Sequence, residues 1–167
     1  MTKVFDLASF GIATCGPTGL ALGKGNQMMI GCSTGQSILF DPTANSGNGA
    51  VIATFTQAIG IDELAFDPTL GLFFLASSMN GVSVIDGIAD DFLQQLPTFA
   101  GSHSVSVDPV SNEVFVPLRN TTTIAGCVTG CVEVFAAAVP EPGTLPLMAG
   151  GLLALFGFAL RRRTRQE

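Results

Sequence analysis

The sequence predicts an all-β body followed by one C-terminal membrane helix, and three observations support this prediction. Short runs rich in β-branched and aromatic residues recur through residues 1–138, each bounded by turn-forming Gly, Pro, Asn or Asp. The runs repeat regularly, because Leu64 follows Leu20 by 44 residues and Val105 follows Leu64 by 41. A long, almost wholly apolar run appears only near the end, from Leu145 to Leu160. We therefore expect a repeat-built β domain and a separate terminal segment.

The β domain is predicted to contain three repeats, near residues 16–56, 60–98 and 101–139. Each repeat holds three clear strand candidates, and these lie at 20–23, 28–32 and 37–41, at 64–68, 72–77 and 82–86, and at 105–109, 113–117 and 132–135. Fourth strands are predicted at 50–56 and 91–96, whereas the third repeat has only 136–139 left for one. Hairpin turns are predicted at 67–71 and 108–112, where Asp or Asn bonds its own backbone and Pro presets φ, and at 23–26.

The repeat length is that of a four-stranded propeller blade. Phe66-Asp-Pro, Val107-Asp-Pro and the strand that starts at Glu113 resemble the YVTN-type bacterial β-propellers, in which a strand ending in Asp-Pro precedes a second strand of this kind. The resemblance spans residues 16–135, and the first repeat departs from it with Gly23-Lys24 in place of Asp-Pro. It implies about three propeller-type blades. A sandwich of similar short strands is the competing architecture.

Three blades do not close a ring, since propellers typically have about four to eight. We therefore expect an open arc, and a chain that is a fragment of a longer protein. In that interpretation Lys3–Phe10 forms the last strand of a preceding blade. The first residues also lack the basic and apolar pattern of a signal peptide, which favours a missing N-terminus. Assembly of two or more copies into a ring is the alternative.

The last part of the chain, residues 139–167, has three parts in a fixed order. They are Pro140, Glu141, Pro142 and Gly143, a predicted transmembrane helix at 145–160, and the basic anchor residues Arg161, Arg162, Arg163 and Arg165 in the tail 161–165. This order of parts resembles the PEP-CTERM sorting signal of Gram-negative bacteria. The arginines would hold that end on the cytoplasmic side. The resemblance implies recognition by an exosortase-type membrane protease. The other interpretation is a buried C-terminal helix with a solvated basic tail.

Charge and cysteine content constrain the partners and the compartment. Residues 1–140 contain three basic and eleven acidic side chains, a formal charge of −8, which excludes nucleic acid as an expected partner. The four cysteines fit an oxidising compartment. We predict a disulfide between Cys15 and Cys32, because they flank the first hairpin and its register brings them close together. We also predict a disulfide between Cys127 and Cys131, because Cys-x₃-Cys without a nearby His is a poor zinc pattern. No metal site is predicted.

Three residues at the starts of first strands are candidate channel ligands. His103 is the only histidine, Asp62 and Glu63 occupy the comparable position one repeat earlier, and Thr18 lies there in the first repeat. A ring of such side chains resembles the cation and general-base site of gluconolactonase-like propellers. The alternative interpretation is a strand-end histidine that is satisfied by neighbouring backbone groups.

The combined interpretation is a non-enzymatic, exported protein of the cell surface or exopolysaccharide matrix of a Gram-negative bacterium. Its propeller-like domain would have a binding or structural role. The precursor would be anchored in the inner membrane by helix 145–160, would face the periplasm, and would be processed by an exosortase-type protease. Extracellular polysaccharide is a candidate partner, and no cofactor is predicted. The alternative function is a lactonase-like hydrolase, truncated at its N-terminus, for which calcium would be the cofactor.

Overall fold

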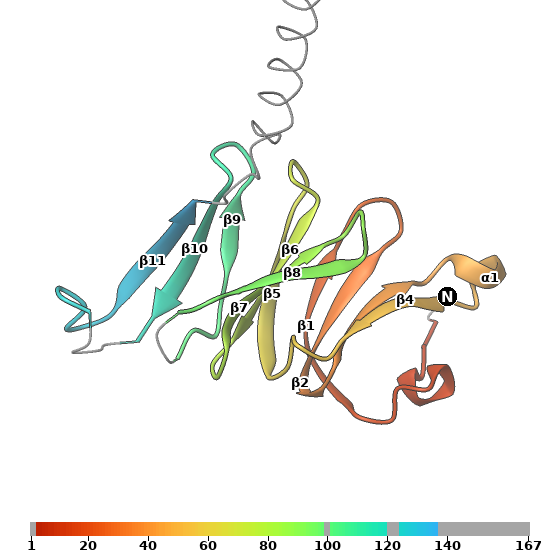
Figure 1. The fold of residues 1–167 in the computed structure, drawn as a ribbon. Helices are drawn as coiled ribbons and strands as arrows, with labels where there is room; N and C mark the ends of the chain where they lie inside the picture. The colour runs from red at the N-terminus through yellow and green to blue at the C-terminus, as the bar shows by residue number, and fades with distance from the viewer. Residues whose placement is uncertain (1–2, 99–100, 120–123, 137–167) are drawn as a thin grey trace, which may run out of the picture. The chain divides into compact units, whose positions relative to one another are not determined.

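The computed structural model describes residues 3–98, 101–119 and 124–136, which form three antiparallel sheets (Figure 1). Sheet A contains β1 (Cys15–Leu22), β2 (Met28–Gly35), β3 (Ser37–Asp41) and β4 (Ala50–Phe55). Sheet B contains β5 (Ile61–Asp67), β6 (Leu72–Ser77), β7 (Gly81–Asp86) and β8 (Asp91–Leu96). Sheet C contains β9 (Ser106–Asp108), β10 (Glu113–Leu118) and β11 (Cys131–Ala136).

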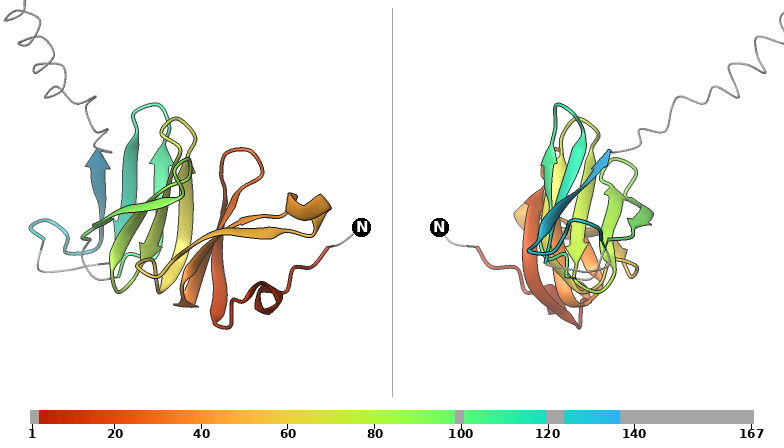
Figure 2. Two further views of the ribbon diagram at one scale, coloured as in Figure 1. Left: turned by 45° about the vertical axis from the view of Figure 1, so that its right-hand side comes forward. Right: turned by 90° about the vertical axis from the view of Figure 1, so that its left-hand side faces the viewer.

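Each sheet is a meander in which strands that follow one another in sequence are hydrogen-bonded neighbours. The sheets also follow one another in chain order through the body, as the colour gradient shows (Figures 1 and 2). The fourth strands predicted for the first two repeats are confirmed as β4 and β8. Sheet C has three strands within the described part of the chain, and most of the fourth strand predicted at 136–139 lies outside it.

Two short helical segments interrupt the strands. These are the 3-10 helix η1 (Leu7–Phe10) and α1 (Ala44–Gly47), which lies between β3 and β4. The prediction that Lys3–Phe10 is a strand is therefore wrong. The Asp6 side chain accepts a hydrogen bond from the Ala8 amide, and Gly11 ends the turn at φ 81° in the left-handed region. An N-cap acceptor before a short apolar run and a glycine after it favour a helical turn over a strand.

The predicted hairpin turns are confirmed at the first strand connections of sheets B and C. Asp67 Oδ1 accepts the amides of Thr69 and Leu70 at 2.8 and 3.1 Å, and Asp108 Oδ1 accepts the Val110 amide at 2.8 Å. Each turn closes through a residue of positive φ, namely Gly71 at 73° and Asn112 at 57°. The Asp-Pro repeat thus encodes a turn geometry rather than a ligand site.

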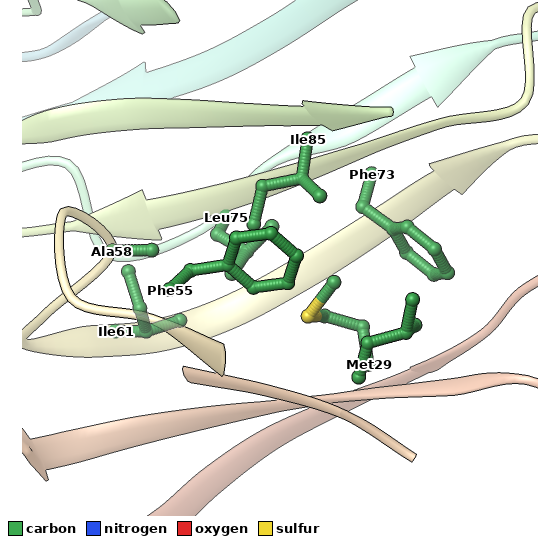
Figure 3. Packing of buried hydrophobic residues seen from close by; sticks show 8 residues of the cluster. Met29, Phe55, Ala58, Ile61, Phe73, Leu75 and Ile85 are labelled. Carbon is green, nitrogen blue, oxygen red and sulfur yellow. The ribbon is translucent and has the colours of Figure 1, made fainter. Parts of the chain in front are cut away.

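Sheet B lies between the other two sheets and is buried on both faces. One core cluster joins Met29 and Leu39 of sheet A to Phe73, Leu75 and Ile85 of sheet B, and it also contains Phe55, Ala58 and Ile61 (Figure 3). A second cluster joins the opposite face of sheet B to sheet C, through Phe74, Ala76, Val82 and Val84 on one side and Val105, Val114, Val116 and Leu118 on the other. Burial on both faces accounts for the continuous apolar run of β6.

The N-terminal segment covers the remaining face of sheet A. Phe5 and Phe10 pack edge-on against Phe40, with ring centroids 5.2 and 5.1 Å away. Beside this contact a hollow of about 430 Å³ opens between Phe5 and Leu7 on one side and β1 and β2 on the other. The apolar residues that suggested a strand therefore form a cap. No helix within the described ranges is long and apolar enough to cross a membrane, and the helix predicted at 145–160 lies outside them.

Candidate functional site

The candidate site lies where sheet B meets the loop that leads into β9. The first strand of sheet B, β5, contacts β1 on one side and β9 on the other. The starts of the first strands of successive sheets are therefore close in space. Asp62 is the second residue of β5, and His103 lies three residues before β9 begins. The topology thus brings together two side chains that are 41 residues apart in sequence.

Asp62 and His103 form a direct side-chain pair. His103 Nδ1 lies 2.5 Å from Asp62 Oδ2, which is short for a hydrogen bond between side chains. The two side chains are 43% and 34% exposed, so the pair lies at the rim of the body rather than in its core. With Asp62 ionised, Nδ1 carries the proton and donates it, which leaves the other ring nitrogen, Nε2, for a further partner.

The loop that carries His103 is fixed to sheet B by three further contacts. Ser102 is fully buried, and its hydroxyl donates to the Ser77 carbonyl at 3.2 Å and lies 2.8 Å from Thr98 Oγ1. The Gly101 amide donates to the Ser78 carbonyl at 3.4 Å. These bonds hold the two residues that directly precede His103. The imidazole is consequently held in place by its own backbone as well as by Asp62.

Neither Glu63, the third predicted channel ligand, nor Thr18, at the equivalent position of the first repeat, joins this pair. Glu63 is exposed, and its side chain makes no hydrogen bond or ion pair within residues 3–98, 101–119 and 124–136. The Thr18 hydroxyl donates to the carbonyl oxygens of Ile61 and Gly31 instead, so it links sheet A to β5. Across the described part of the chain, no three His, Cys, Asp or Glu side chains converge in a way that could hold a metal ion.

Arg119 is a residue that the sequence did not single out. It follows β10, and together with His103 it lines a hollow of about 320 Å³ whose other walls are Gly101, Ser104, Pro117 and Leu118. The arginine stem lies against Gly101, where a Cβ would come 3.6 Å from Cδ. Its guanidinium forms no ion pair with any carboxylate of the described residues. Arg119 is one of only three basic side chains in residues 1–140, and this rarity is the sequence signal that could have pointed to it.

The structure joins Cys15 to Cys32 and Cys127 to Cys131, with Cα atoms 5.1 and 5.2 Å apart. The Cys15–Cys32 bond joins β1 to β2 at the irregular start of the ladder between them. Here Cys15 lies opposite Gly35, and Pro17 lies opposite Cys32. The second bond closes the short turn that precedes β11. Cys32 and Cys127 are almost completely buried, so both bonds belong to the packed body.

Comparison with known families identifies the terminal segment. The PEP-CTERM protein-sorting motif matches residues 138–163, which confirms the sorting-motif prediction. The motif marks an exported protein whose precursor is membrane-anchored and is sorted to the cell surface of a Gram-negative bacterium by an exosortase-type protease. Pro140, Glu141, Pro142, Gly143 and the arginines 161–163 and 165 all lie outside the residues that the structure describes.

The β body has a distant structural relative and no curated sequence relative. No curated protein matches the chain. Among solved structures, hydrazine synthase of Kuenenia stuttgartiensis is similar at a TM-score of 0.60 and 14% sequence identity, over 75% of this chain. The chain spans about a third of the length of that structure, 34%. At this identity the likeness concerns the arrangement of strands alone.

Proposed function

We propose that the mature protein is a surface or matrix protein whose β body works as a propeller-type binding or structural domain. In this proposal the three sheets are consecutive blades, and the exopolysaccharide matrix is the setting in which they act. The sorting motif anchors the precursor for an exosortase-type membrane protease, and this processing separates the body from the terminal segment and sends it to the cell surface. The body itself carries out no chemistry.

Three features of the body support the blade assignment. Each sheet is a meander, the first strands of successive sheets are in contact, and sheet B is buried on both faces. In a propeller the first strands line the centre and each blade packs face to face on the next. A sandwich also packs sheets face to face, but it has two layers, whereas this body stacks three.

The sorting motif is the observation that carries the proposal, and the disulfides agree with it. Disulfides persist in proteins outside the cytoplasm and are rare within it. The Cys15–Cys32 and Cys127–Cys131 bonds therefore fit the compartment that the motif specifies.

The decisive experiment follows processing of the full chain, placed behind an export signal in a Gram-negative host that has the matching protease. We expect a membrane-bound precursor and a shorter product released from it. Replacing Pro140, Glu141 and Pro142 with Ala should leave the precursor uncut. Pro109→Ala is the matched control, because Pro109 is an exposed proline of a body turn, and it should be processed normally. Unchanged processing of the triple variant would refute the sorting role.

The Asp62–His103 pair favours a second candidate, a lactonase-like hydrolase. A carboxylate that orients an imidazole is a common arrangement for a general base. The two functions are separated by incubating the purified protein with calcium and a panel of lactones. Hydrolysis that disappears in His103→Gln would replace the binding proposal with the enzymatic one. We expect no turnover above that of the variant.

A further inference from the structure

We propose that the hollow between residues 101–104 and the end of β10 binds a small carboxylate-bearing sugar, a hexuronate, through Arg119 and His103. This inference deepens the proposed binding role of the body and rests on it. The hollow is lined by Gly101, His103, Ser104, Pro117, Leu118 and Arg119.

Charge distribution is the first argument. Residues 1–140 carry a formal charge of −8, with Lys3, Lys24 and Arg119 as the only lysines and arginines. An acidic body repels anions, so an anion site on it needs locally concentrated positive groups. Arg119 lines the hollow and supplies a positive charge there, next to the single histidine of the chain.

The state of Arg119 is the second argument. The guanidinium fork of an arginine matches a carboxylate in two parallel hydrogen bonds. Arg119 is exposed and has no carboxylate partner among the described residues, and its stem lies against Gly101. The fork is therefore available to a carboxylate from outside.

Preorganisation is the third argument. The Ser102 anchor to the Ser77 carbonyl fixes the loop, and Asp62 holds His103 through Nδ1. With Nδ1 donating to Asp62, the remaining ring nitrogen, Nε2, can accept a hydrogen bond from a hydroxyl group of the sugar. A site whose groups are held before binding loses less conformational entropy when the ligand arrives.

The size and lining of the hollow select the class of ligand. A volume of about 320 Å³ lies at the lower end of the range for small-molecule pockets, roughly 300–1,000 Å³. Pro117 and Leu118 supply an apolar wall beside Arg119 and His103. A single hexuronate ring combines both requirements, because it presents a carboxylate at one end and C–H surface on its faces.

The test is calorimetric titration of the full chain with digalacturonate, with the neutral disaccharide of galactose as the ligand control. We expect digalacturonate to bind and the neutral sugar not to bind. Arg119→Gln should lower the affinity about tenfold or more, since a hydrogen bond between charged groups is lost. The affinity of Arg119→Lys should lie between those of the parent protein and Arg119→Gln, because lysine keeps the positive charge but cannot form two parallel hydrogen bonds. His103→Gln should weaken binding severalfold.

Lys24→Gln is the matched control, since it makes the same change in net charge at the β1–β2 turn of sheet A. It should change the affinity by less than about twofold at moderate salt. Equal binding by Arg119→Gln and the parent protein, equal losses in both charge variants, or equal binding of the neutral sugar would each overturn the proposal. Thermal unfolding followed by circular dichroism establishes that each variant is folded. Processing of the precursor is measured separately, so failure here does not count against the sorting role.

Discussion

Gly19 and Gly31 lie opposite each other in the β1–β2 ladder, and both lie directly against β5. A Cβ at Gly31 would come 2.5 Å from Ile61 Cγ2 and 2.8 Å from Leu64 Cδ1, and one at Gly19 would come 2.8 Å from the Asp62 carbonyl oxygen. The glycine pair therefore sets how closely sheet A approaches the first strand of sheet B. It also supports the strand end that presents Asp62 to His103.

The first prediction concerns this close approach. Gly31→Ala should lower the free energy of unfolding by about 1–3 kcal/mol, because the added methyl group overpacks a buried contact. Denaturant unfolding followed by circular dichroism measures the change. In the control variant Gly16→Ala, the new Cβ meets the hydroxyl groups of Ser33 at 2.7 Å and Thr34 at 3.5 Å, and both of these side chains are exposed and can adjust. That variant should lose less than about 1 kcal/mol. Equal losses would show that the sheets do not approach as closely as described.

The Asp62–His103 pair should contribute little to stability. Both side chains are more than a third exposed, and exposed ion pairs typically contribute about 0–1 kcal/mol. A double-mutant cycle with Asp62→Asn and His103→Gln, analysed by unfolding in denaturant, should therefore give a coupling energy below about 1 kcal/mol that decreases further at high salt. A coupling energy well above this value would assign the pair a structural role and weaken its candidacy as a binding element.

The two disulfides should differ in their contributions to stability. The Cys15–Cys32 bond joins residues 17 positions apart, whereas Cys127 and Cys131 are separated by 4. The loop-entropy model gives about 3 kcal/mol for the longer loop and about 2 kcal/mol for the shorter one. Replacing each pair with Ala and measuring urea unfolding should reproduce this order. Thiol labelling of the denatured parent protein without reductant should detect no free cysteine. A larger loss for the Cys127 and Cys131 pair would contradict the order.

Strands were predictable where local chemistry and packing agree. The β6 strand has a continuous apolar run, is flanked by turns, and is buried on both faces. In contrast, β1 begins at Cys15, five residues before the strand predicted at Leu20. The intervening Gly16 and Pro17 signal a break, but the structure accommodates them at two irregularities of the ladder. Proline is tolerated at such positions, and composition alone does not reveal where they lie.

Sequence patterns also do not show which residues far apart in the chain come into contact. This explains the wrong prediction at the N-terminus and the residue that was missed at the site. Phe5 and Phe10 are apolar because they cover Phe40, and an apolar spacing cannot separate a cap from a strand. Asp62 and His103 could be predicted as neighbours because they occupy equivalent places in consecutive repeats. Arg119 was missed because it follows the second strand of its sheet, and it reaches the loop at Gly101 only through the fold.

The last prediction concerns acid stability at the repeated turns. The Val110 amide bonds the Asp108 carboxylate and holds the pKa of that group below its usual value, and the Thr43 hydroxyl does the same for the pKa of Asp41. A carboxyl whose pKa is lower in the folded state stabilises the fold above its unfolded pKa, and the stabilisation is lost as the pH falls through the folded pKa. The effect should therefore be fully present at neutral pH and decline progressively as the pH falls below about 4.

Asp108→Asn separates the charge from the turn geometry, since an asparagine oxygen accepts the same amide and does not titrate. Unfolding free energies measured between about pH 2 and pH 7 should fall less steeply with acidification in Asp108→Asn than in the parent protein. Asp108→Ala removes the acceptor as well, so it should show the same shallow slope and a lower stability at every pH. Parallel pH profiles for the parent protein and Asp108→Asn would show that the lowered pKa of Asp108 is not coupled to folding.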